Sequence, residues 1–169
     1  YTPPPSPGGG GSVGNTDGST LRSNAFVANG GEQLSFDFNY VTSDGATFTD
    51  YAWARLLRAS DLTQYAVLVT ARTNYDPTGG GAVTVIPGFG LPTPDATLSP
   101  ASVPIIDAGY SPGVVGPNWT PLGPDYNGTC WDIGCGYTGW INASYTIADP
   151  GNYVLEFGVT NWDDTLWDS

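Results

Sequence analysis

The sequence predicts an all-β protein, an antiparallel, jelly-roll-like β-sandwich with long loops. The chain of 169 residues contains 24 Gly and 15 Pro, and 13% of its residues are aromatic. Aromatic residues favour strands, and clusters of Gly and Pro favour the turns between them. Helix-favouring residues are scarce, since Lys and Met are absent and Glu occurs only at Glu32 and Glu156. This length suffices for one domain with a sizeable core and an additional segment.

The additional segment is the N-terminal stretch "YTPPPSPGGGGSVGNTDG", residues 1–18. Its Pro-rich half favours an extended polyproline conformation, and its Gly-rich half favours flexibility. We therefore divide the chain into an extended arm, residues 1–18, and a sandwich domain, residues 19–169. The arm is interpreted either as an interdomain linker or as a segment that reaches a neighbouring subunit.

Four strands are predicted in the first half of the domain, at 20–28, 33–41, 51–59 and 65–72. Strict alternation in the second of them predicts one apolar face and one polar face. The fourth, "YAVLVTAR", is almost continuously apolar, which is typical of a central strand covered on both faces. The predicted apolar face comprises Leu34, Phe36, Phe38 and Tyr40, and the polar face comprises Ser35, Asp37 and Asn39.

The second half begins with a long segment, residues 74–124, that is rich in Gly, Pro, Asp and Thr. It predicts ordered loops on one surface, with short strands at 82–86 and 102–106. Two further strands, 137–147 and 152–162, are joined by the turn sequence "ADPG". In the first of these, the predicted inward residues are Ile141, Ala143, Tyr145 and Ile147, and the outward ones are Trp140, Asn142, Ser144 and Thr146.

The charge and composition exclude several classes of function. The chain carries 16 acidic residues against 4 basic ones, a net charge of −12, which repels nucleic acid. No apolar run approaches the ~20 residues of a membrane span. Because His and Lys are absent, only carboxylates could act as acid–base catalysts, and no spacing selects a pair. We therefore expect a protein that is not an enzyme.

The two cysteines, Cys130 and Cys135, are separated by four residues. A zinc site would need further Cys or His ligands, which the chain lacks, and the spacing is not that of a redox dithiol. The pair therefore predicts a disulfide that closes a small loop. A disulfide in turn predicts an oxidising compartment, with the protein extracellular or at the cell surface.

Three blocks together resemble a known family: "FDFNYVTSDGATFTDYAWARLL", "CWDIGCGYTGWINASYTI" and "GNYVLEFGVTNWDDTLWDS". They are similar to exported bacterial proteins with a sorting tail of the PEP-CTERM type, over roughly residues 18–169. The resemblance implies a β-sandwich with an exported location and no established enzymatic activity. In that family a further strand and the sorting tail normally follow the last block. Here the sequence ends at Ser169, so we expect the sheet to lack one strand and the tail to be absent.

Two acidic segments predict a cation site. Asp44 and Asp50 bracket one loop, and Asp163, Asp164 and Asp168 crowd the last turn. In sandwiches of related appearance, an Asp before a "YA" strand joins an Asp of the closing turn around calcium. Ca²⁺ takes six to eight oxygen ligands, which these side chains and loop carbonyls would supply. We therefore expect a structural Ca²⁺, with a solvated acidic surface as the alternative, because no EF-hand pattern is present.

Contacts with carbohydrate are predicted at two kinds of position. Asn118, Asn127 and Asn142 each begin an N-x-S/T tripeptide, a glycosylation signal that is weak when it stands alone. Asn142 gains support because the alternation places it on the outward face. Trp119 and Trp140 are candidates for exposed rings that hold a sugar, although tryptophans near loops often cap the ends of a sandwich.

Together these features predict a structural subunit of an extracellular filament or fibril. The partners would be copies of the same chain, associated head-to-tail through the arm and through strand addition at an open sheet edge. Such contacts, when they do not close into a ring, form an open helical polymer. The alternative is a secreted, calcium-stabilised carbohydrate-binding module, which explains the tryptophans but not the arm.

Overall fold

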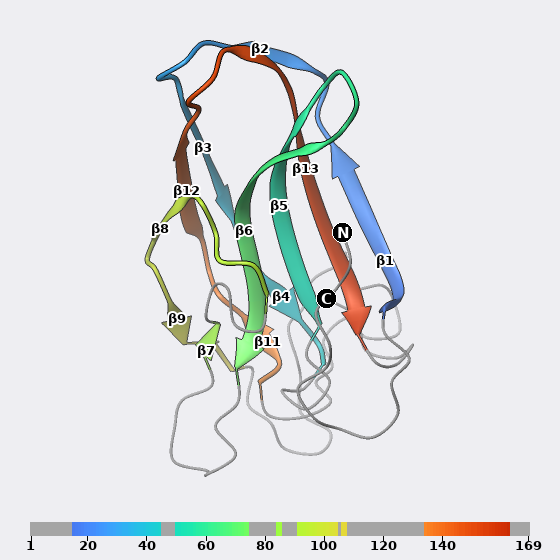
Figure 1. Cartoon of the computed structure of the whole chain (residues 1–169). Helices are drawn as coiled ribbons and strands as arrows, with labels where there is room; N and C mark the ends of the chain where they lie inside the picture. Colours follow the sequence, from blue (N-terminus) through green and yellow to red (C-terminus); the bar gives the residue numbers. More distant parts are fainter. Residues whose placement is uncertain are drawn as a thin grey trace.

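A computed structural model describes residues 15–44, 50–74, 84–85, 91–104, 106–107 and 134–162. All the regular structure within these residues is β-strand, and every strand pair is antiparallel (Figure 1). The predicted all-β class is therefore confirmed. The described segments contain no helix that could cross a membrane.

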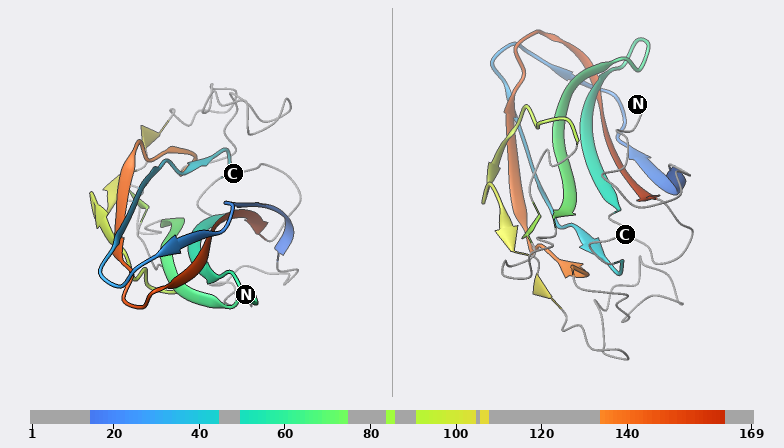
Figure 2. Two further views of the ribbon diagram at one scale, coloured as in Figure 1. Left: turned by 90° about the horizontal axis from the view of Figure 1, so that it is seen from above. Right: turned by 60° about the horizontal axis from the view of Figure 1, so that its bottom comes forward.

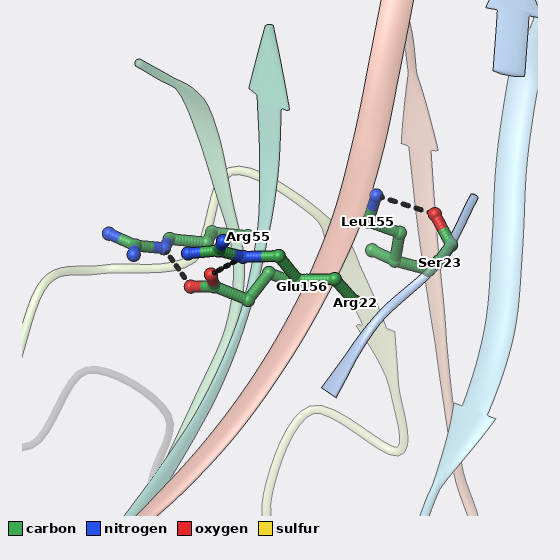
Figure 3. A network of polar contacts seen from close by, with 5 residues as sticks. All are labelled: Arg22, Ser23, Arg55, Leu155 and Glu156. Carbon is green, nitrogen blue, oxygen red and sulfur yellow. Dashed lines mark hydrogen bonds and ion pairs between the residues drawn. The ribbon is translucent and has the colours of Figure 1, made fainter. Parts of the chain in front are cut away.

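The first layer is a sheet in which the strands follow the order β1-β13-β5-β6-β7-β9, with β2 also paired to β13. Its members are β1 (Asn15–Arg22), β2 (Phe26–Ala28), β5 (Tyr51–Arg58), β6 (Gln64–Asn74), β7 (Thr84–Val85), β9 (Val103–Pro104) and β13 (Gly151–Trp162). Strands β1 and β2 lie along the same edge of β13. In the gap between them, the Ser23 N–H donates to the Leu155 carbonyl at 2.9 Å, and the Leu155 N–H donates to Ser23 Oγ at 3.0 Å (Figure 3). Together β1 and β2 therefore form one interrupted edge.

The second layer consists of two short sheets, ordered β3-β12-β8 and β10-β11-β4. Its members are β3 (Gln33–Phe38), β4 (Val41–Thr42), β8 (Thr97–Ser99), β10 (Ile106–Asp107), β11 (Gly136–Tyr137) and β12 (Ile141–Thr146). Between the two sheets, the Thr138 N–H donates to the Tyr40 carbonyl at 2.9 Å, and the Tyr40 N–H donates to Thr138 Oγ1 at 3.0 Å. These bonds make β4 a continuation of β3 and join the sheets into one layer.

The two layers face each other around an apolar core (Figure 2, left). Leu56, Leu68 and Tyr153 are buried in the first layer, and Ala143 and Ile147 are buried on the second. The rings of Phe36 and Phe157 meet edge-to-face across the core, with centroids 5.2 Å apart. The alternation predicted for β3 and β12 is confirmed, since their apolar residues point inward and most of their polar ones are exposed.

The two sides of the sandwich differ. On one side the chain passes from β8 in the second layer to β9 in the first and then to β10 in the second, so it connects the layers. On the other side, the β1–β2 edge ends the first layer and β3–β4 ends the second, within the described residues. We call this second side the open side.

The predicted strands at 51–59, 65–72 and 152–162 are confirmed. Those at 33–41 and 137–147 are confirmed in part, because residues 39–40 separate β3 from β4 and residues 138–140 separate β11 from β12. Two further details of the prediction were wrong. Strand β1 begins at Asn15, inside the predicted arm 1–18, and the predicted strand 20–28 is interrupted at Ser23. Residues 15–19 of β1 escaped prediction because backbone pairing to β13 holds the strand, whereas its described side chains, from Gly18 onward, are exposed. The short strand β8 was also missed.

Candidate functional site

An apolar cavity of about 430 Å³ lies at the open side, between the two layers. Strands β1, β3–β4, β5, β6 and β13 line it, mostly with carbon atoms. The residues that line it include Leu21, Phe38, Tyr40, Val41 and Phe157. Because an apolar cavity of about 150 Å³ already admits a benzene ring, this one has room for several apolar side chains.

Leu21 shows that the open side is incompletely covered. It lies opposite Phe157 in the β1–β13 ladder, and it lines the cavity, yet 70% of it is exposed. An aliphatic side chain that lines the interior of a sandwich is normally buried by the facing layer. Here the facing layer ends at β3–β4, so water reaches the side chain.

The cavity is bounded by two strand edges. Among the described residues, β3 pairs only with β12 and β1 pairs only with β13, so each carries an edge without a neighbouring strand. Such an edge presents backbone N–H and C=O groups that can pair with another chain. The geometry therefore suits an extended peptide that places apolar side chains in the cavity and pairs its backbone with an edge.

A buried ionic cluster fixes β1 in the first layer. Glu156 is fully buried, and its two carboxylate oxygens accept hydrogen bonds from Arg22 Nε at 2.6 Å and from Arg55 Nε at 2.5 Å (Figure 3). Burial raises the pKa of Glu156, but the hydrogen bonds and charges of Arg55 and Arg22 outweigh burial and hold that pKa below its usual value. The cluster joins β1, β13 and β5 in one register.

The described residues include the first acidic segment and the residue that precedes the second. Asp44 and Asp50 are both buried, and the Trp162 N–H donates to Asp50 Oδ1 at 2.9 Å. The end of β13 therefore touches the residue that precedes β5. Asp163, Asp164 and Asp168 follow Trp162 in the sequence and lie outside the described residues.

No group of three potential metal ligands occurs in the part of the chain that the structure describes. A positive charge does lie at this end of the molecule. Arg72 of β6 is fully buried, with its guanidinium carbon 5.2 Å from the Tyr51 ring centroid and 5.5 Å from that of Trp162. Arg72 therefore places a positive charge near the rings of Tyr51 and Trp162, and the calcium site stays a prediction.

The predicted carbohydrate positions have different surroundings. Trp140 is 70% exposed, in agreement with the expected outward face. Asn142 also lies on this face, but its Nδ2 atom donates to Asp37 Oδ1 at 2.9 Å and to Ser35 Oγ at 3.1 Å. A glycan on that nitrogen would have to replace these bonds within the central strand of the layer. Asn118, Trp119 and Asn127 lie outside the described residues.

One of the two cysteines is described. Cys135 is completely buried and is not a free cysteine, whereas Cys130 lies outside the described residues. The pairing of Cys130 with Cys135 stays a prediction.

Sequence reasoning missed the Arg22–Glu156–Arg55 cluster and the cavity. The available signal was Glu156 itself, a carboxylate in the middle of the otherwise apolar run "YVLEFGV". A charge in such a position is buried only when it is paired, so it predicts an Arg partner on a neighbouring strand.

Comparison with protein-family models, with curated proteins and with solved structures finds no significant match to this chain. The resemblance to exported proteins with a sorting tail therefore stays a prediction. Any functional proposal depends on the geometry of the open side and on the composition of the chain.

Proposed function

We propose that the chain is a structural subunit of an extracellular filament or fibril, in which copies associate head-to-tail through their open sides. The observation that carries this proposal is the apolar cavity between two strand edges, with Leu21 exposed at its lining. An exposed apolar surface beside an unpaired edge is a typical site of strand addition.

A second copy of the chain suits this site better than a small apolar ligand does. A small ligand would fill part of the cavity but would not pair with the edge of β3 that has no neighbouring strand among the described residues. A polypeptide supplies both components, since alternate side chains enter the cavity while the backbone pairs with the edge. Contacts of this kind, repeated in one direction without closure, form a filament.

The extracellular location is proposed on three grounds. They are the predicted disulfide, the strongly acidic surface and the resemblance to exported proteins. A net charge of −12 keeps individual copies soluble at high concentration, which a secreted subunit requires before assembly.

We include a structural calcium ion in the proposal, at the end of the molecule where Trp162 meets Asp50. The support is the contact between these residues, because it brings Trp162, which directly precedes Asp163 in the sequence, to the buried Asp50. A cation there would offset the repulsion between carboxylates and hold the two segments together.

Electron microscopy and sedimentation of the purified full-length chain test the proposed function. We expect regular filaments or concentration-dependent assembly from the natural sequence, and loss of assembly in Leu21→Asp, which places a charge at the cavity. Val27→Asp is the matched control, since Val27 is 74% exposed and lies on β2 outside the cavity lining. Both variants are first compared by circular dichroism and melting temperature. Dispersed monomers of the natural sequence at high concentration would contradict the proposal.

A secreted carbohydrate-binding module is the second candidate. The 70% exposure of Trp140 supports it, since an accessible aromatic ring is a common surface for holding a sugar. A glycan array with the natural chain and with Trp140→Ala tests it. Specific sugar binding that the variant loses would favour this function over the structural one.

A further inference from the structure

We propose that β1 is the strand that passes between copies, so that β1 of one copy pairs with β13 of the next. This inference rests on the proposed function and specifies how the copies are connected. In each copy, the β1 strand of a neighbour would then pair with β13. The residue pairs would be the same as those that β1 and β13 form within a single chain.

The first observation is that β1 is peripheral in its own copy. It pairs with β13 alone, and its described residues, from Gly18 to Arg22, are exposed. None of them belongs to the core clusters of the described residues. If β1 leaves, the ladder to β13 and the Arg22 contact are lost, and the apolar core keeps its packing.

The second observation is that the β13 edge selects the strand that it accepts. Glu156 is fully buried, and its charge requires the guanidinium of Arg22 in addition to that of Arg55. Toward the other end of β1, a Cβ atom at Gly18 would lie 2.7 Å from the Val159 carbonyl oxygen, so this register admits only Gly. A strand with Gly and Arg at these two positions is the β1 of another copy of this chain.

The third observation is the interruption between β1 and β2. At Ser23 the regular ladder stops, and two hydrogen bonds to Leu155 replace it. Figure 3 shows the one that the Leu155 N–H donates to Ser23 Oγ. Residues 23–25 are exposed and carry small or short side chains, so they can change direction without disturbing the core. An incoming Ser23 can make the same two bonds, which is why exchange costs few contacts.

The exchange is compatible with an open polymer, because each copy can donate its β1 to the next copy and accept a β1 from the copy before it. Since β1 forms one wall of the cavity, exchange brings a neighbouring chain to the open side. The cavity and the edge of β3 then keep the surroundings that they have in a single chain. Successive copies are then arranged in one direction, from the copy that donates β1 to the copy that accepts it.

Cysteine cross-linking of assembled protein tests the inference. Ser19 lies opposite Val159 in the β1–β13 ladder, so S19C/V159C places two thiols across that pair. After assembly and mild oxidation, we expect a ladder of covalent multimers on a denaturing, non-reducing gel. S35C/S144C is the matched control, because Ser35 lies opposite Ser144 in the β3–β12 ladder of one chain, and it should give monomers.

The outcomes separate this inference from the proposed function. Filaments whose S19C/V159C chains run only as monomers overturn the exchange and leave the structural role standing. Absence of any assembly overturns both. If the double variant does not fold, filaments grown from a mixture of S19C chains and V159C chains provide the same test. Covalent dimers between the two kinds of chain are then expected, and their absence overturns the exchange.

Discussion

The Nε atom of Arg22 lies 2.6 Å from the Oε2 atom of Glu156, although 134 positions separate the two residues in the chain. The contact attaches an exposed edge strand to a fully buried carboxylate, and Arg55 contacts the other oxygen of the same group. The first layer therefore has one ionic junction that spans three adjacent strands. Its strength can be measured by changing the carboxylate alone.

Glu156→Gln is expected to lower the free energy of unfolding by about 1.5–3 kcal/mol, the range for hydrogen bonds to charged groups, because the arginines that lose the charge are partly exposed. The variant removes the negative charge and leaves the partly buried Arg55 without its counter-charge. Urea unfolding of both proteins measures the difference. Glu32→Gln is the matched control, since the Glu32 side chain is exposed and accepts its hydrogen bonds from Asn29 in the same turn, and the change should affect stability little. Equal stability of Glu156→Gln and the natural chain would contradict a stabilising role for the ion pairs of Glu156 with Arg22 and Arg55.

Stability should also fall in acid through Glu156. The pKa of Glu156 is lower in the folded protein than in the unfolded chain, where it is about 4.3. Ionised Glu156 therefore makes its full contribution to the free energy of unfolding above about pH 4.3. This contribution is lost as the pH falls through the lower pKa of the folded state. The stability difference between the natural chain and Glu156→Gln should therefore shrink below about pH 4. Urea unfolding from pH 7 down to about pH 2 tests this. Taking the difference cancels other groups with a lowered pKa, such as Asp61 and Glu32. A difference that stays constant with pH would contradict the prediction.

Gly158→Ala should destabilise the fold by about 1–3 kcal/mol, the usual cost of overpacking. A Cβ atom at this position would lie 2.1 Å from Cζ2 of Trp53, whose ring covers the glycine. Gly151→Ala is the milder comparison, because its Cβ would meet the Tyr153 ring at 3.3 Å. Thermal unfolding of both variants should rank Gly158→Ala as the less stable, and the opposite order would contradict the packing described.

Removal of calcium should lower the melting temperature of the natural chain. In Asp50→Asn the side-chain oxygen can still accept the Trp162 N–H, but the carboxylate charge is gone, so the melting temperature should respond weakly to chelator. Asp37→Asn, on the outer face of β3, should keep the full response. Calorimetry with and without chelator provides the readout. Metal analysis that finds no bound calcium, together with an unchanged melting temperature, would exclude the site.

The strands that could be predicted from the sequence are those in which the pattern of apolar and polar side chains matches their burial. In β3 and β12 strict alternation marks one buried face, and in β6 a continuous apolar run marks burial on both faces. Strand β1 carries no such pattern, because its described residues are exposed and backbone bonds to β13 hold it. Its position depends on a partner at the far end of the sequence, which local periodicity does not reveal.

The candidate site was predicted in outline only. The sequence indicated an open edge beside the last strand, but β13 pairs with β1 and β2 on one side and with β5 on the other. The structure shows the Asp50–Trp162 contact, while the second acidic segment lies outside the described residues. The cavity could not be predicted, because it results from where two layers end rather than from any residue type. Leu21 illustrates the difficulty, since an aliphatic residue in a predicted strand gives no sign that 70% of it stays exposed.

Strand β1 has a mechanical consequence. In the β1–β13 ladder Asn15 pairs with Trp162, so the chain enters the first strand and leaves the last one at the same end of the molecule. A pulling force applied between these two residues would peel β1 from β13 one pair at a time, starting at that end. The junction of Arg22 with Glu156 lies at the opposite end of β1 and would be the last to break. The force at which a single molecule opens should therefore depend on the direction of pulling, with low resistance to unzipping and high resistance to shear along β1.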